Sequence, residues 1–241
     1  MYNLERFTYR EMMQCRGTIR ELFGAAEMPS LAAGAERVVD FFYENLADAK
    51  GNRACALVRM FKTHPFEALD DELRSFASSI VPDAYRIPGL RCLVLVATRG
   101  EEPAWNSCHE SRGHRCIPLA SEKMVEEAPM ISQLIKQIGL KISDVVHPDP
   151  GLMLDQHKVN YNVFYVPTAE GSPFIVAQDF VKRYGIASVI GFGGVAGASD
   201  LVATILFSRV PISADVADLF RVIGLNVRIA VLPLITKPLF V

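Results

Sequence analysis

The densest group of chemically reactive side chains in this chain lies in the segment Trp105–Cys116 (WNSCHESRGHRC). Besides the single tryptophan, it contains Cys108, His109, His114 and Cys116. Neutral imidazole and thiolate are ligands for zinc, iron and haem iron. The spacing C-H-x4-H-x-C nevertheless lacks the paired C-x2-C knuckles of a dedicated zinc module. Three interpretations therefore stay open: a solvated polar loop, a metal or haem site, and thiol redox chemistry.

Redox chemistry would need a nucleophilic thiolate and a second thiol that can approach it. Cys108 and Cys116 lie close enough in sequence to meet in a loop. The cysteine number is odd and the positions are mostly far apart, which is poor evidence for a disulfide framework and predicts a reducing, cytoplasmic location. The complete set is Cys15, Cys55, Cys92, Cys108 and Cys116.

A second motif is the glycine-rich run Gly191, Gly193, Gly194 and Gly197. A dinucleotide-binding loop would require a strand, then G-x-G-x-x-G, then a helix that receives the phosphates. Here a second apolar strand follows, so we predict a glycine-rich hairpin. G-x-S-x-G, HExxH, Walker and kinase motifs are missing from the sequence. The sequence therefore contains no established catalytic signature.

The composition describes a folded domain with a large core. Half of the 241 residues are hydrophobic and the net charge is −2, so no basic surplus suggests a nucleic-acid partner. The N-terminus lacks the apolar stretch of a signal peptide. The apolar region Ile186–Phe207 approaches the length of a membrane span. Because it contains several glycines and Asp200, we predict two strands joined by a turn and no membrane insertion.

The elements that would position these residues follow from hydrophobic periodicity and from caps. Residues 143–157 form a proline- and aspartate-rich connection that we expect to be irregular. In the first part of the chain we predict helices at 2–23, 30–47 and 70–80, and strands at Ala54–Thr63, Arg91–Thr98 and Cys116–Ala120. A helix then runs from the N-cap Ser121 to about Ile138, with a break at Pro129 and Gly139 as its C-cap.

The last 80 residues have the order β-α-β-β-α. The final helix carries a continuous apolar stripe, made by Val216, Leu219, Phe220, Ile223, Val227, Ala230 and Val231. The predicted elements are strand Tyr161–Val166, helix Ala177–Tyr184, strands Ser188–Gly193 and Leu201–Ser208, and helix Ser213–Leu232. The five longer strands should form one largely antiparallel sheet. We divide the chain into an N-terminal helical segment, 1–29, and a domain, 30–241.

This order of elements resembles a GAF domain. The likeness is carried by Val181–Gly194 (VKRYGIASVIGFGG), which is similar to the passage before that family's last hairpin, and by Asp200–Ser208 followed by a long helix. The resemblance implies an α/β (α+β) fold, with a GAF-like antiparallel sheet, helices on both faces and long terminal helices. Residues 1–47 look like the segment that often precedes such domains in bacterial histidine kinases and diguanylate cyclases.

A GAF-like domain would hold a small molecule or cofactor, with haem or iron possible, between the sheet and the helices. The resemblance extends to GAF-fold free methionine sulfoxide reductases through Cys108 and Cys116, which leaves a thiol redox enzyme as the alternative. The pair Cys108-His109 invites comparison with bilin attachment, but its position and flanking residues do not match. The candidate ligand-binding residues are Trp105, Cys108, His109, His114, Cys116, Tyr161, Phe164 and Asp179.

The sequence thus predicts a non-catalytic sensory domain. We expect its terminal helices to form a homodimer, because the stripe on the last helix is longer than one sheet face normally needs. A ligand-driven shift of these helices would then act on a histidine kinase or cyclase output module.

Overall fold

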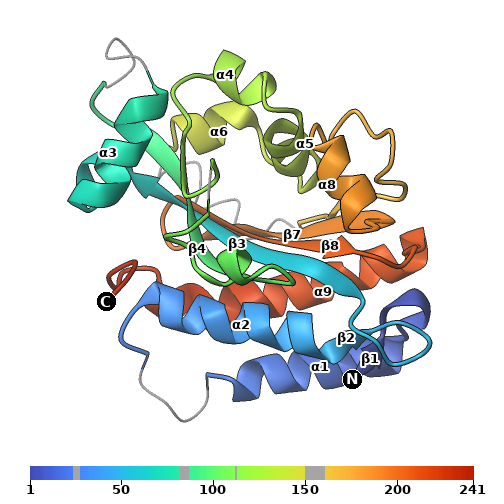
Figure 1. Ribbon diagram of the computed structural model, residues 1–241. Coiled ribbons are helices and arrows are strands. Elements are labelled where there is room, and N and C mark those ends of the chain that lie inside the picture. The colour runs from blue at the N-terminus through green and yellow to red at the C-terminus, as the bar shows by residue number, and fades with distance from the viewer. Residues whose placement is uncertain (24–27, 82–86, 112, 150–160) are drawn as a thin grey trace.

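A six-stranded antiparallel sheet separates two layers of helices in the computed structural model, which describes residues 1–23, 28–81, 87–111, 113–149 and 161–241 (Figure 1). The strand order is β5-β4-β3-β8-β7-β6, and every neighbouring pair is antiparallel. The bounds are β3 Cys55–Pro65, β4 Arg91–Gly100, β5 Cys116–Pro118, β6 Phe164–Val166, β7 Ser188–Ala196 and β8 Asp200–Ser208. The predicted α+β fold with one antiparallel sheet and helices on both faces is confirmed.

Long helices form the lower layer in Figure 1 and shorter helices form the upper layer. The lower layer consists of α1 Tyr9–Glu21, α2 Leu31–Asn45 and α9 Ala214–Val231. The upper layer consists of α4 Glu122–Glu126, α5 Pro129–Gln137, α6 Ile142–Val146 and α8 Gln178–Arg183, while α3 Asp71–Ile80 lies at one end of the sheet. Two short parallel strands, β1 Tyr2–Asn3 and β2 Leu46–Ala47, pair beside α2. None of the helices described has the length and apolarity needed to span a membrane.

Serine caps set the beginnings of three helices where the sequence predicts them. The side chains of Ser30, Ser121 and Ser213 accept hydrogen bonds from backbone amides in the first turns of α2, α4 and α9. Gly139 follows α5 with a φ of +95°, a left-handed conformation that favours glycine at the end of a helix.

The predicted first helix, 2–23, is wrong at its start, because α1 begins at Tyr9. Thr8 and Glu11 form a capping box: the Glu11 amide donates to Thr8 Oγ1 at 3.2 Å, and the Thr8 amide donates to Glu11 Oε2 at 2.8 Å. This reciprocal pair favours an extended conformation at Thr8. Residues 2–3 upstream form a strand instead.

The break predicted at Pro129 is confirmed: the segment that follows Ser121 forms two helices, α4 and α5, and Pro129 starts the second, where its missing amide hydrogen costs no helical bond. Two other boundaries differ from the predictions. The connection predicted at 143–157 contains the end of α6, and its residues from 150 onward lie outside the described residues. The strand predicted from Tyr161 begins at Phe164, so β6 pairs with β7 along a short stretch only.

Each face of the sheet has its own hydrophobic core, because side chains along a strand alternate between faces. On β3, Val58 and Met60 join the lower core, whereas Leu57 and Phe61 join the upper core. The lower core also takes the apolar stripe of α9, including the fully buried Phe220, whose ring centroid lies 5.5 Å from that of Phe192 on β7. The chain's own sheet therefore covers most of the stripe that we had expected to extend beyond it.

Glycines let helices approach β7 closely from both faces. A Cβ at Gly191 would lie 2.6 Å from Leu134 Cδ1 of α5. On the opposite face, a Cβ at Gly224 of α9 would lie 3.1 Å from Phe192 Cβ and 3.3 Å from the Gly193 amide nitrogen. The glycine-rich run ends in the β7–β8 turn, as predicted, with Gly197 at a φ of +65°.

A buried ion cluster links β3, β4 and β8. Lys62 Nζ lies 2.8 Å from Asp200 Oδ2, and these side chains are only 2% and 17% exposed. The Arg91 guanidinium also pairs with Asp200 and donates a hydrogen bond to Thr63 Oγ1 at 3.0 Å. His64 Nδ1 lies 3.2 Å from Lys62 Nζ. Two cations therefore share one carboxylate within the sheet.

Candidate ligand-binding cavity

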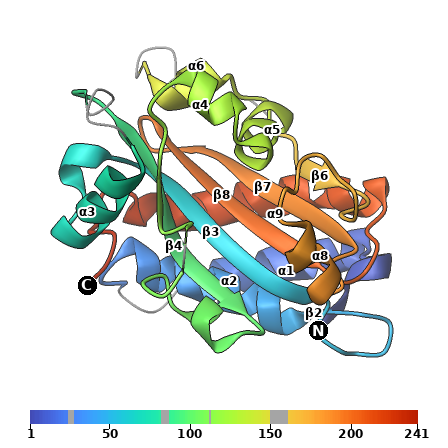
Figure 2. The same cartoon turned by 45° about the horizontal axis from the view of Figure 1, so that its top comes forward.

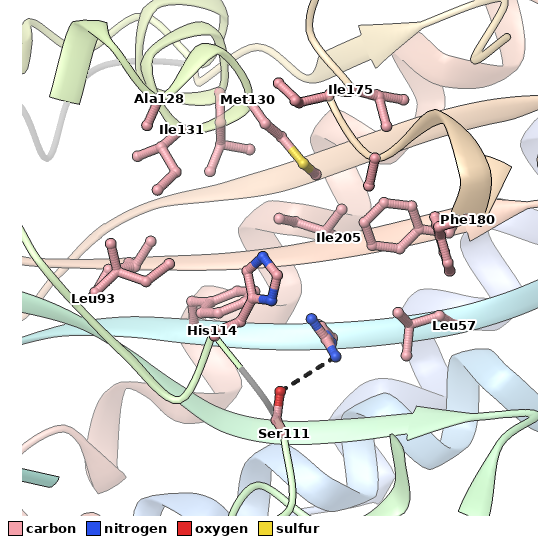
Figure 3. A pocket seen from close by; sticks show the side chains of 18 of the residues that line it. Leu57, Leu93, Ser111, His114, Ala128, Met130, Ile131, Ile175, Phe180 and Ile205 are labelled. Atoms are coloured by element: carbon pink, nitrogen blue, oxygen red, sulfur yellow. Dashed lines mark hydrogen bonds between the residues drawn. The ribbon is translucent and has the colours of Figure 1, made fainter. Parts of the chain in front are cut away.

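A cavity of about 700 Å³ lies between the upper face of the sheet and the upper layer of the structure (Figure 3). Its size falls within the range of small-molecule sites in proteins. In Figure 2 this face of the sheet is seen between α5 and α8. Most of the lining side chains are apolar, and many belong to residues of the upper core. An apolar ligand body would therefore be removed from water here.

The floor of the cavity is made by alternate residues of the central strands. Leu57, Arg59 and Phe61 come from β3, and Ile205 and Phe207 come from β8. Arg59 and Ile205 are directly opposed in the β3–β8 register. Because opposed residues of an antiparallel pair project to the same face, their side chains lie side by side on the cavity floor.

The walls come from segments far apart in the sequence. Met130 and Ile131 of α5 face the cavity from one direction, and Phe180 of α8 faces it from another (Figure 3). Leu134 of α5 also lines the cavity. Trp105, in the short 3-10 helix Pro103–Asn106, lines the cavity and packs its ring at 5.6 Å from that of Phe180. Of the candidate ligand-binding residues that the sequence predicts in the segment 105–116, Trp105 and His114 line this cavity, whereas Cys108, His109 and Cys116 are not part of its lining.

The lining contains few polar side chains: Arg59, Glu110, Ser111 and His114. Arg59 Nη2 donates a hydrogen bond to Ser111 Oγ at 3.4 Å, drawn as the dashed line to Ser111 in Figure 3. Burial lowers the pKa of Arg59 to about 10, so the guanidinium remains protonated at neutral pH. The cavity is thus an apolar site with a cationic group on its floor.

The cysteines and histidines of the 105–116 segment point in different directions. His114 lines the cavity, whereas His109 Nδ1 lies 3.5 Å from Glu72 Oε2 and its ring packs on Phe240. Cys116 belongs to the lower core, and Cys108 packs against the upper core. Across the described ranges, no group of three or more His, Cys, Asp or Glu side chains is placed to hold a metal ion. The four potential ligands are not brought together.

The thiols are also poorly suited to nucleophilic chemistry. Burial raises the pKa of Cys108 to about 12, and the pKa of Cys116 is raised by its hydrogen bond with Cys92 and by burial. Reactive cysteines require a substantial thiolate fraction. This geometry gives the thiol redox alternative no support.

Three other predicted residues are not among those that line the cavity. Tyr161 lies under the Arg228 guanidinium, 4.6 Å from the ring centroid. Phe164 is fully buried in the upper core beside Gly191, and Asp179 is exposed in the first turn of α8. Sequence reasoning missed Arg59, although a signal was present: it is a charged residue inside the apolar strand segment ACALVRMFKT.

No protein-family model matches this sequence, and no curated protein matches it. Among solved structures, the chain is similar to the GAF domain of a phosphoenolpyruvate-protein phosphotransferase (ptsP) from Coxiella burnetii. The superposition has a TM-score of 0.42 with 13% sequence identity, and it covers 91% of this chain and 92% of that chain.

Proposed function

We propose that this chain is a regulatory domain of the GAF-like sensory type, and that it binds a small molecule in the cavity between β3, β8, α5 and α8. The observation that carries the proposal is the cavity itself: about 700 Å³ of space over the sheet, with an apolar lining and a few polar groups. Sites with this combination are the usual places for small ligands. A non-catalytic role fits the four buried cysteines, the raised pKa of the half-buried Cys108 and the missing catalytic motifs.

The single tryptophan gives a direct test, because Trp105 lines the cavity. N-phenyl-1-naphthylamine is a neutral, apolar probe whose fluorescence rises in apolar surroundings and which accepts energy from tryptophan. We expect saturable probe emission on excitation of Trp105, with matching quenching of the tryptophan. Ala128→Phe, which adds a ring at the cavity wall, should weaken binding at least fivefold.

Ala33→Phe is the matched control, because Ala33 packs against the lower core on the opposite side of the sheet. Both variants add the same volume, and thermal unfolding of each separates overpacking from loss of the site. Equal probe affinity in the wild type and Ala128→Phe would contradict the proposal. So would the absence of saturable binding to the folded wild-type chain.

We further propose that the domain is a homodimer formed through α1 and α9. The side chains that support this lie outside the buried stripe of α9: Leu225, Ile229 and Leu232 are exposed at i, i+4 and i+7, and Ile229 is 56% exposed. Met13 on the neighbouring α1 is also exposed. A second copy would cover both helix faces, and a cytoplasmic histidine kinase or cyclase module would receive the shift of these helices.

A further inference from the structure

Arg59 is the basis of a more specific inference about the ligand, which rests on the proposed function. Its side chain leaves β3 toward the cavity, between those of Leu57 and Phe61. Burial of a cation in an apolar site is costly unless the charge is paired and hydrogen-bonded. Any hydrogen-bond or charge partner that this guanidinium lacks within the chain therefore indicates what a ligand in the cavity would supply.

The guanidinium is incompletely partnered. Its Nη2 makes one long hydrogen bond to Ser111, and its Nε is buried with no hydrogen-bond partner. Among the described residues, Arg59 forms no ion pair with a carboxylate. Glu110 also lines the cavity, but it is exposed to solvent and makes no ion pair with Arg59. The positive charge is therefore unbalanced within the described part of the site.

A second polar group beside Arg59 also lacks a partner. Thr98 of β4 is directly opposed to Arg59 in the β3–β4 register, so both side chains project from the same face. The Thr98 hydroxyl is buried and has no hydrogen-bond partner in the described structure. The buried polar groups of native proteins are usually satisfied. Thr98 is not part of the cavity lining, whereas Arg59 is, so the incompletely partnered Arg59 guanidinium is the group that points to an acceptor from outside the chain.

We propose that the cavity binds an amphipathic monoanion, and that Arg59 is the residue that recognises its carboxylate. A planar guanidinium matches a carboxylate through two parallel N–H···O bonds, with Ser111 beside it. The apolar body of the ligand lies against Ile205, Phe207 and Met130. One guanidinium balances one negative charge, whereas a phosphate monoester carries close to two at pH 7 and would leave charge unpaired in this apolar site.

Decanoate and decanol test this inference, because they share an apolar chain and differ in charge. Each would be titrated against the chain loaded with N-phenyl-1-naphthylamine, and its dissociation constant obtained from probe displacement. We expect decanoate to bind the wild type at least tenfold more tightly than decanol. Arg59→Met should weaken decanoate at least tenfold and change decanol less than twofold, because the methionine keeps an apolar side chain of similar length.

Two further variants complete the test. Arg20→Met replaces an exposed arginine of α1, on the opposite side of the sheet, and should change neither affinity. Arg59→Lys keeps the charge without the bidentate fork and should retain part of the preference for decanoate. If Arg59→Met fails to fold, as judged by circular dichroism, the preference for decanoate over decanol is compared between Arg59→Lys and the wild type instead.

The outcomes separate this inference from the function on which it rests. Displacement by both ligands with equal affinity would overturn anion recognition while leaving a small-molecule cavity in place. Equal weakening of decanoate and decanol in Arg59→Met would also overturn it, because the arginine would then act only on the shape of the site. Failure of the neutral probe to bind would reject the proposed function and, with it, this inference.

Discussion

Replacing Asp200 with asparagine should destabilise the fold more than any surface charge change. The substitution keeps the shape of the side chain and removes the only negative charge near Lys62 and Arg91 among the described residues. Both cations are almost fully buried, at 1% and 7% exposure, so solvent cannot replace the lost carboxylate. Removing one partner of a buried ion pair costs about 3–5 kcal/mol. Because Asp200 is itself 17% exposed, we expect a loss near the lower end, about 3 kcal/mol.

Urea unfolding followed by far-ultraviolet circular dichroism measures this loss as a shift of the midpoint at constant m-value. Asp218→Asn is the matched control, because Asp218 pairs with Arg221 on the surface of α9. An exposed pair of this kind contributes at most about 0.5 kcal/mol. Lys62→Met should cost less than Asp200→Asn, because one cation and one anion then remain.

Two results would refute this reasoning. The first is a loss below about 1 kcal/mol for Asp200→Asn, which would mean that the two cations tolerate burial without a counter-ion. The second is an equal loss for Lys62→Met and Asp200→Asn. In that case the packing of the side chains, and not the charge balance of the cluster, would determine stability.

Three further predictions concern pH, thiols and assembly. Burial and a neighbouring lysine lower the pKa of His64 from 6.5, so the unfolded chain binds a proton more readily and stability should fall as the pH drops below about 6.5. His64→Gln should make the melting temperature depend less on pH between 7.5 and 5.5. An unchanged pH dependence in this variant would count against the prediction. With the pKa of Cys108 raised to about 12, Ellman's reagent should label this thiol slowly in the native chain and completely in the urea-unfolded chain. The native chain should also fail to reduce free methionine sulfoxide. Fast labelling of Cys108 or turnover of methionine sulfoxide would contradict the structure. Light scattering at micromolar concentration should give the mass of a dimer for the wild type. The double variant Leu225→Glu with Ile229→Glu should give the mass of a monomer, with little change in melting temperature. A wild-type protein with the mass of a monomer would exclude the dimer.

The main elements of the fold were predictable because their signals are local. Continuous apolar runs, which are typical of strands buried on both faces, indicated the long strands. Ser30, Ser121 and Ser213 marked the helix starts through their capping side chains. The error at the N-terminus also has a local cause, since Thr8 and Glu11 form a capping box that can be read in the sequence. Strand order was less accessible, because it depends on pairings between residues far apart in the chain.

The site was less predictable than the fold. A shared metal or redox site was one of the interpretations left open for the reactive side chains close in sequence, but Cys116 lies on β5, where alternation sends it to the face opposite Ile117 and away from the cavity. His109 turns toward Glu72 instead. Only the tertiary structure shows that Arg59 shares its face of the sheet with the cavity, although its charge in an apolar strand was visible beforehand.

The close contacts on both sides of β7 have a mechanical consequence. Leu134 touches the backbone at Gly191 and also lines the cavity, while Gly224 of α9 lies against Phe192 and Gly193 on the other face. The Leu134 side chain can change rotamer, but the glycine backbone that it touches has no such freedom. A displacement of α5 that Leu134 does not absorb would therefore move the strand or open a void above it. Because glycines at both contacts bring each helix close to the backbone of β7, the strand would pass such a displacement from the cavity to α9.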